Sequence, residues 1–258
     1  MKILIFNSSS RAVERAASAI ADRLEANPRI VLGLATGGTM LDLYRDLVAQ
    51  TAGRKLSFAQ ATSFNLDEYV GLAPDHPASY HSYMRECLFS KVDFSAENTH
   101  LPRGDATDLE AEARDYEARI AKAGGIDLQL LGIGQNGHIG FNEPSSSLAS
   151  RTRIKTRTAS THSANACYFA SPDQMPKYAL TMGVGTILDS RECLLLATGP
   201  AKAAAVAAMV EGPVSASCPA SVLQFHQHAT VILDRAAATD LKLLDYYHYV
   251  HPEDDVRA

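Results

Sequence analysis

Residues 30–48, IVLGLATGGTMLDLYRDLV, join an apolar run to a glycine turn and then to a helical pattern. Ile30 to Ala35 is almost wholly apolar, as strands of parallel sheets are when helices cover both of their faces. Leu41, Tyr44 and Val48 then recur at i, i+3 and i+7, which places them on one face of a helix. A buried strand that turns tightly into a helix is the repeating unit of parallel α/β sheets.

Further short apolar runs indicate that this unit repeats along the chain. They are residues 2–6, 61–66, 127–133, 192–197 and 230–234. Helix boundaries are signalled between them by a Thr107-x-x-Glu110 capping box, by Gly124 and Gly125, and by first-turn prolines at Pro77 and Pro200. We therefore predict an α/β fold, a single domain over residues 1–258 with a doubly wound, mostly parallel, Rossmann-like sheet that binds ligands at the carboxyl ends of its strands.

Composition excludes several classes of protein. The chain of 258 residues has a formal charge of −5, which gives no general attraction to nucleic acid or to acidic membranes. No apolar run approaches the roughly 18 residues of a membrane span, and we find no signal peptide. The cysteines lie far apart without a CxxC pair, at Cys87, Cys167, Cys193 and Cys218. We expect reduced thiols in a cytoplasmic protein.

Two of the predicted strand ends carry groups suited to phosphate. After residue 35, hydroxyl groups and backbone N–H groups meet at a helix start, in Thr36, Gly37, Gly38 and Thr39. After residue 197, Gly199 and Pro200 open a second helix with Lys202 in its first turn. Each feature alone is also typical of an unliganded turn or a surface lysine. Their occurrence on one sheet edge favours a phosphate site.

Asp67 and Glu68 follow the third apolar run. Adjacent side chains of an extended backbone point to opposite sides, so only one of these carboxylates should face a shared cleft. An unpaired carboxylate there is a candidate general base. The alternative is a helix cap or a surface acid.

A glycine-rich turn, LGIGQNGHIGFNEP at residues 131–144, surrounds His138. A lone histidine is more often structural than catalytic. Here Asn136 and Glu143 are placed to fix the tautomer and orientation of the imidazole. A carboxylate partner also stabilises the imidazolium, so that the ring can both take and give a proton.

Together these segments resemble the glucosamine-6-phosphate deaminase family. The matching motifs are ATGGTMLDLYRDL, FNLDEYVGL followed by HPASYHSYM, LGIGQNGHIGFNEPSSSLASRTRIKT and YALTMGVGTIL, and they cover about residues 30–234. The resemblance implies conversion of glucosamine 6-phosphate and water into fructose 6-phosphate and ammonia in amino-sugar catabolism. This chemistry implies no cofactor and no essential metal.

The resemblance also implies roles for individual residues. Asp67 would move the proton from C2 to C1 of the open-chain sugar. His138, held by Glu143 and Asn136, would open the pyranose ring. The TGGT loop and Lys202 would hold the phosphate.

The chain departs from the family at two positions. Many members have aspartate at the position of Asn136, so we expect His138 to depend mainly on Glu143. The family usually has a phosphate-binding arginine at the position of His162. Because histidine loses its charge as pH rises, we expect phosphate binding to weaken through the titration of His162.

In allosteric members of the family, residues that correspond to Ser146, Arg153 and Lys155 bind an acetylated amino-sugar phosphate between the subunits of a hexamer. Other members are monomeric, so the resemblance allows a monomer or a homo-oligomer. From the residues alone, the alternating cations at 151, 153, 155 and 157 indicate a solvated strand edge. The pairs His226/His228 and His248/His251 have no third ligand at a recognisable spacing, and we predict no metal site.

Other functions compete with this interpretation. Galactosamine-6-phosphate deaminase-isomerase is similar and shares the asparagine form of the turn. 6-Phosphogluconolactonase is a relative with the same phosphate loop, but it lacks the FNEP continuation at residues 141–144. A sugar-phosphate sensor without activity is the alternative from another class.

Overall fold

The structure is a computed structural model that describes residues 1–158, 169 and 175–252. Its main sheet has seven strands in the order β1-β10-β9-β6-β2-β3-β5, and every neighbouring pair is parallel. The strands are β1 (Lys2–Phe6), β2 (Val31–Leu34), β3 (Thr62–Asn65), β5 (Thr99–His100), β6 (Leu128–Leu131), β9 (Glu192–Ala197) and β10 (Ala229–Asp234). The predicted parallel sheet is confirmed, and the six predicted runs form six of these strands.

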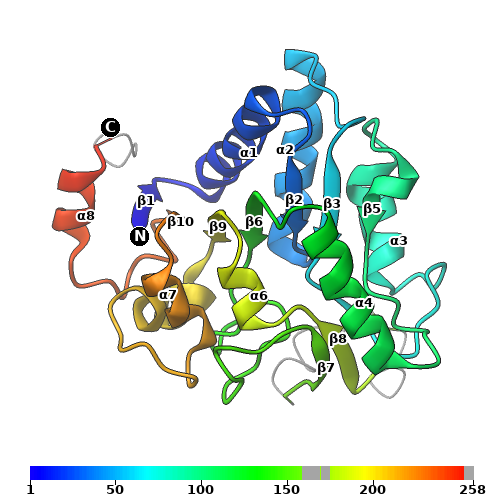
Figure 1. The fold of residues 1–258 in the computed structure, drawn as a ribbon. Helices are drawn as coiled ribbons and strands as arrows, with labels where there is room; N and C mark the ends of the chain where they lie inside the picture. The colour runs from blue at the N-terminus through cyan, green and yellow to red at the C-terminus, as the bar shows by residue number, and fades with distance from the viewer. Residues whose placement is uncertain (159–168, 170–174, 253–258) are drawn as a thin grey trace.

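Helices cover both faces of this sheet. They are α1 (Ser9–Ala26), α2 (Gly38–Arg54), α3 (Tyr80–Met84), α4 (Leu109–Lys122), α6 (Val184–Leu188), α7 (Ala203–Val210) and α8 (Leu244–Val250). In Figure 1, α1 and α2 lie on one side of the row of strands and α6 and α7 on the other. Burial of Ala16, Ile20 and Leu24, spaced four residues apart, shows how α1 presents one apolar face to the sheet. None of the helices among the described residues combines the length and apolarity that a membrane crossing requires.

Two helix starts differ from the prediction. The side chain of Asp108, not Thr107, caps α4 by accepting hydrogen bonds from the N–H groups of the next turn. Pro77 lies in the turn before α3, which Ser79 caps. In both places a neighbouring Asp or Ser is the better-placed acceptor for the free N–H groups. Pro200 does begin a helical turn, the 3-10 segment Pro200–Lys202 that leads into α7.

A second, antiparallel sheet of three strands was not predicted. Its order is β4-β8-β7, with β4 (Asp67–Tyr69), β8 (Tyr178–Thr181) and β7 (Arg153–Thr156). Only Leu66 separates β3 from β4, so the chain passes from one sheet directly into the other. The N–H of Leu66 donates to the carbonyl of Leu34, and its carbonyl accepts from the N–H of Met182. Asp67 is thereby held just beyond the carboxyl ends of the parallel strands.

Candidate active site

A cavity of about 380 Å³ lies at the carboxyl ends of β2, β3, β6 and β9. This is the edge at which doubly wound sheets bind ligands. Eight residues predicted for the site line it: Thr36, Gly37, Gly38, Thr39, Asp67, Asn136, His138 and Lys202. The structure therefore brings together the two strand ends predicted to bind phosphate, the strand end that carries Asp67 and the turn that carries His138.

The start of α2 forms one wall of this cavity. Gly37 precedes the helix with a φ of 115°, a conformation that glycine adopts readily. No side chain of the described residues caps this helix start, so its dipole and N–H groups face the cavity without a built-in acceptor. Lys202 reaches the same cavity from the segment before α7, and burial lowers the pKa of its ammonium group. An anion bound here would contact both the N-terminus of α2 and the ammonium group of Lys202.

Among the residues that line the cavity, Asp67 carries the carboxyl group. Its side chain is only 5% exposed, and burial raises its pKa to about 8. That value is a net result: the negative charge of Glu68 also raises the pKa, whereas the hydrogen bond with the Phe141 amide and the charge of Arg157 lower it. A carboxyl that titrates close to neutral pH can both accept and return a proton.

Glu68 points to the opposite side of β4, as strand alternation predicts. Its carboxylate accepts from the backbone N–H groups of Tyr80 and His81, each at 3.0 Å, and from His81 Nδ1 at 2.8 Å. It thus binds the start of α3 and does not line the cavity. The helix-cap interpretation applies to Glu68, and the cleft position to Asp67.

His138 is oriented by a chain of two side chains. Its Nδ1 lies 2.6 Å from Oδ1 of Asn136, and Nδ2 of Asn136 donates to Oε2 of Glu143 at 2.7 Å. Glu143 itself is 3.5 Å from His138 Nδ1 and almost fully buried. Since an amide oxygen only accepts, Nδ1 carries the proton and Nε2 is the atom that can take another. The close partner is Asn136, and the expected stronger dependence on Glu143 stays a prediction.

The backbone next to the imidazole has no room for a side chain. A Cβ at Gly134 would lie 2.1 Å from Cε1 of His138. The glycine is therefore required by the ring that packs against it, not by its own backbone angle.

Tyr80 is a cavity residue that sequence reasoning missed. Its hydroxyl is 3.1 Å from that of Tyr69 and also bonds the side chain of Thr36. It connects the phosphate-type loop to the aromatic residues around Asp67. Tyr80 lies in the family-like segment HPASYHSYM, but a tyrosine at helical spacing looks the same as a core residue.

The predicted effector residues lie outside the cavity lining. Ser146 is 1% exposed and donates its hydroxyl hydrogen to the carbonyl of Glu143 at 2.6 Å. Arg153 donates to Oδ1 of Asn142 at 2.7 Å, and burial lowers the pKa of Lys155. An effector role for these residues stays a prediction, and His162 falls outside the described residues.

The interpretation of the alternating cations at 151, 153, 155 and 157 as a solvated strand edge was wrong in part. β7 is an edge strand, and Arg151 is exposed and paired with Asp189. Arg157, however, is buried, and Arg153 is half-buried, while the apolar Ile154 between them faces outward. The cations occupy the inner face because aromatic rings and amide oxygens receive them there.

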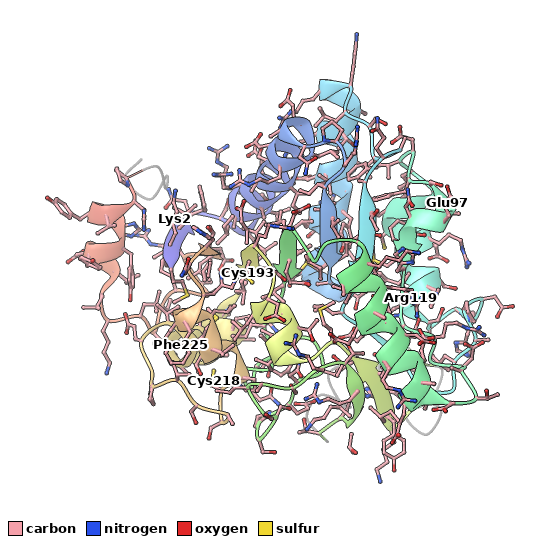
Figure 2. The ribbon with its side chains drawn as sticks, in the orientation of Figure 1. Lys2, Glu97, Arg119, Cys193, Cys218 and Phe225 are labelled. Carbon is pink, nitrogen blue, oxygen red and sulfur yellow. The ribbon has the colours of Figure 1, made fainter. Side chains whose placement is uncertain are left out.

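The described cysteines have no disulfide partner. Cys87, Cys193 and Cys218 are free thiols, and Figure 2 shows Cys193 and Cys218 on separate parts of the fold. Cys218 packs under the histidine turn, where a Cβ at Gly137 would lie 2.6 Å from its Sγ. Cys167, the fourth cysteine, falls outside the described residues, and the reduced state of the thiols stays a prediction.

Comparison with known proteins gives a consistent picture. Residues 7–232 match the family described as glucosamine-6-phosphate isomerases/6-phosphogluconolactonase. A glucosamine-6-phosphate deaminase of Hahella chejuensis is 51% identical over 253 residues, which is 98% of this chain and 97% of that protein. The deaminase of Rhodopirellula baltica is 54% identical over 239 residues, 93% of this chain and 95% of its own length.

Solved structures agree with these sequence matches. A monomeric glucosamine-6-phosphate deaminase superposes with a TM-score of 0.91 at 47% identity, covering 93% of this chain and all of that one. A 6-phosphogluconolactonase from Trypanosoma brucei superposes with a TM-score of 0.76 at 18% identity, over 93% of this chain and 98% of its own, and shows the fold alone. The chain belongs to the glucosamine-6-phosphate isomerase/6-phosphogluconolactonase family.

Proposed function

We propose that this protein converts glucosamine 6-phosphate and water into fructose 6-phosphate and ammonia. The observation that carries the proposal is the shared cavity, in which a carboxyl with a pKa of about 8 and an oriented imidazole adjoin a phosphate-type helix start. Relatives about half identical over nearly the whole chain are glucosamine-6-phosphate deaminases, which supports the same reaction here.

The first step is opening of the pyranose ring. Nε2 of His138 takes the proton of the anomeric hydroxyl, and a proton is returned to the ring oxygen as the C1–O5 bond breaks. The Asn136 and Glu143 side chains keep Nδ1 protonated and the ring in one orientation during both transfers.

The second step transfers a proton between neighbouring carbons. The Asp67 carboxylate removes the proton from C2 of the open-chain aminoaldehyde while the C1 oxygen takes a proton from the substrate's ammonium group, and Asp67 then delivers its proton to C1 of the resulting enolamine. C1 is reduced to an alcohol while C2 is oxidised to an iminium, so no external electrons are needed. Water then adds to C2, ammonia leaves, and fructose 6-phosphate remains.

The phosphate site holds the substrate by its phosphate group, at the end remote from the reacting carbons. Replacing Lys202 by methionine should raise KM for glucosamine 6-phosphate by about 10- to 100-fold, the worth of one charge-assisted hydrogen bond. The value of kcat should fall much less, because the lysine acts on the remote phosphate. Steady-state kinetics measures this, with the exposed Lys122→Met as the matched control. An unchanged KM in Lys202→Met would place the phosphate elsewhere.

The decisive assay incubates the purified protein separately with glucosamine 6-phosphate and galactosamine 6-phosphate and measures ammonia. Release from glucosamine 6-phosphate is the expected result. Release only from the galacto epimer would identify a galactosamine-6-phosphate deaminase-isomerase. Absence of ammonia from both, with either sugar phosphate bound, would instead favour a sensor.

A further inference from the structure

Arg157, directly after β7, carries a buried charge that forms no ion pair or side-chain hydrogen bond among the described residues. Its side chain is 6% exposed, and its Nε, Nη1 and Nη2 atoms have no hydrogen-bond partner there. The Cζ atom instead lies 4.9 Å from the ring centroid of Tyr69 and 5.6 Å from that of Phe141. Buried guanidinium groups are ordinarily paired, so an unpaired one requires a reason.

The rings beneath Arg157 locate it on the side of Asp67. Asp67 and Tyr69 are two residues apart on β4 and point to the same face, whereas Glu68 points to the other. Phe141, the second ring, lines the cavity. Its neighbour Gly140 approaches Asp67 so closely that a Cβ there would lie 3.3 Å from Oδ2. The guanidinium therefore lies on the Asp67 face of β4, against the cavity wall.

Because Arg157 forms no ion pair among the described residues, no carboxylate in contact offsets its positive charge there. Arginine stays protonated at every physiological pH, even where burial lowers its pKa, as it does here. A carboxylate within contact distance would cancel its field. Among the described residues the guanidinium instead packs on two aromatic faces, which attract it without neutralising it, and its charge acts on Glu143 and Asp67. In a dry site, such a charge acts strongly on the next ionisable group.

We propose that Arg157 is a positioning residue for the proton transfer, whose buried guanidinium allows Asp67 to become a carboxylate inside the cavity. The proposal rests on the proposed function, which makes Asp67 the base. Without a nearby cation, a carboxyl so deeply buried beside Glu68 would keep its proton and could not accept the one from C2.

Other titratable groups surround Asp67. Glu68 and Tyr69 on β4, Tyr80 on α3 and Tyr116 on α4 interact with it electrostatically. His138 and Lys202 line the same cavity, and Glu143 acts on Arg157. Glu68 opposes ionisation of Asp67, whereas Arg157 favours it. Removing Arg157 should therefore raise the pKa of Asp67 above its value of about 8.

Arg157→Met tests this by the pH dependence of kcat/KM for glucosamine 6-phosphate. We expect the acid limb to move up by about one pH unit or more, the usual effect of one nearby opposite charge, with roughly tenfold lower activity at pH 7 for each unit. Arg157→Lys, which keeps the charge, should return the acid limb most of the way to its wild-type pH. Arg151→Met, on the same segment but exposed and paired with Asp189, is the matched control and should leave the limb in place.

A second measurement does not depend on the reaction. Infrared difference spectra between the protein and its Asp67→Asn variant report the band of the Asp67 carboxyl group. The midpoint of this band in a pH titration should rise when the same difference is taken with Arg157→Met present in both proteins. If the wild type released no ammonia, the proposed function would fail while this titration still decided the role of Arg157. An unchanged midpoint in folded Arg157→Met, or in Arg157→Gln should the methionine variant not fold, would overturn the proposal.

Discussion

Asp67→Asn is expected to lower the rate of ammonia release by about 10²- to 10⁴-fold, the usual contribution of a general base. The amide keeps the size of the carboxyl and lines the same cavity, but it cannot take a proton from C2. KM should change little, because the phosphate end of the site is untouched. The assay is ammonia release at saturating glucosamine 6-phosphate, with the exposed Asp75→Asn as control. A variant with more than a tenth of the wild-type kcat would exclude Asp67 as the base.

The same substitution should stabilise the protein at alkaline pH. The folded protein holds the pKa of Asp67 at about 8, whereas an unfolded chain loses that proton near pH ~4. The folded state therefore binds the proton more tightly, and stability falls as pH rises between these values. Asparagine avoids burying this charge. We expect a higher Tm for Asp67→Asn at pH 8.5 and nearly equal values at pH 4. A lower Tm at pH 8.5 would contradict the buried carboxyl.

Gly134→Ala should disable ring opening without unfolding the protein. The new methyl group would overlap the His138 ring, whose Cε1 lies 2.1 Å from the Cβ position. The ring is the movable end of a side chain, so it swings away and loses the 2.6 Å contact with Asn136. We expect about a 10²-fold or greater loss of kcat/KM, because a displaced imidazole no longer reaches the anomeric oxygen.

The control for this change is Gly53→Ala. Gly53 lies near the end of α2, where a Cβ meets no atom within 4 Å. Alanine there should leave activity unchanged and raise the free energy of unfolding by up to about 1 kcal/mol. NMR of the His138 Nδ1–H proton would show whether its hydrogen bond is lost in Gly134→Ala. Full activity in that variant would mean that the imidazole is not required where the structure places it.

The main sheet could be predicted because its strands are buried on both faces. Such strands read as short apolar runs, and each predicted run is a strand. β5 has two residues, too few for a pattern, and the small sheet has polar strands such as β4, Asp67–Tyr69. Their stability comes from contacts with segments distant in sequence, so local periodicity does not report them.

The site could be assembled from sequence because parallel strands bring their ends to one edge. Thr36, Asp67, His138 and Lys202 each follow a recognisable strand, and all line the cavity. Arg157 was misjudged because an alternating cation indicates a strand face without indicating which face is buried. That face is set by the aromatic rings of Tyr69 and Phe141, which a pattern within β7 cannot contain.

Leu66, the single residue between β3 and β4, determines which of two carboxylates faces the cavity. Since strand side chains alternate with a period of two, one residue added or lost at Leu66 would turn Asp67 toward α3 and bring Glu68 into the cavity. Two adjacent carboxylates thus differ in role because they point to opposite faces of β4. A change in the length of this joint would exchange a base for a helix cap.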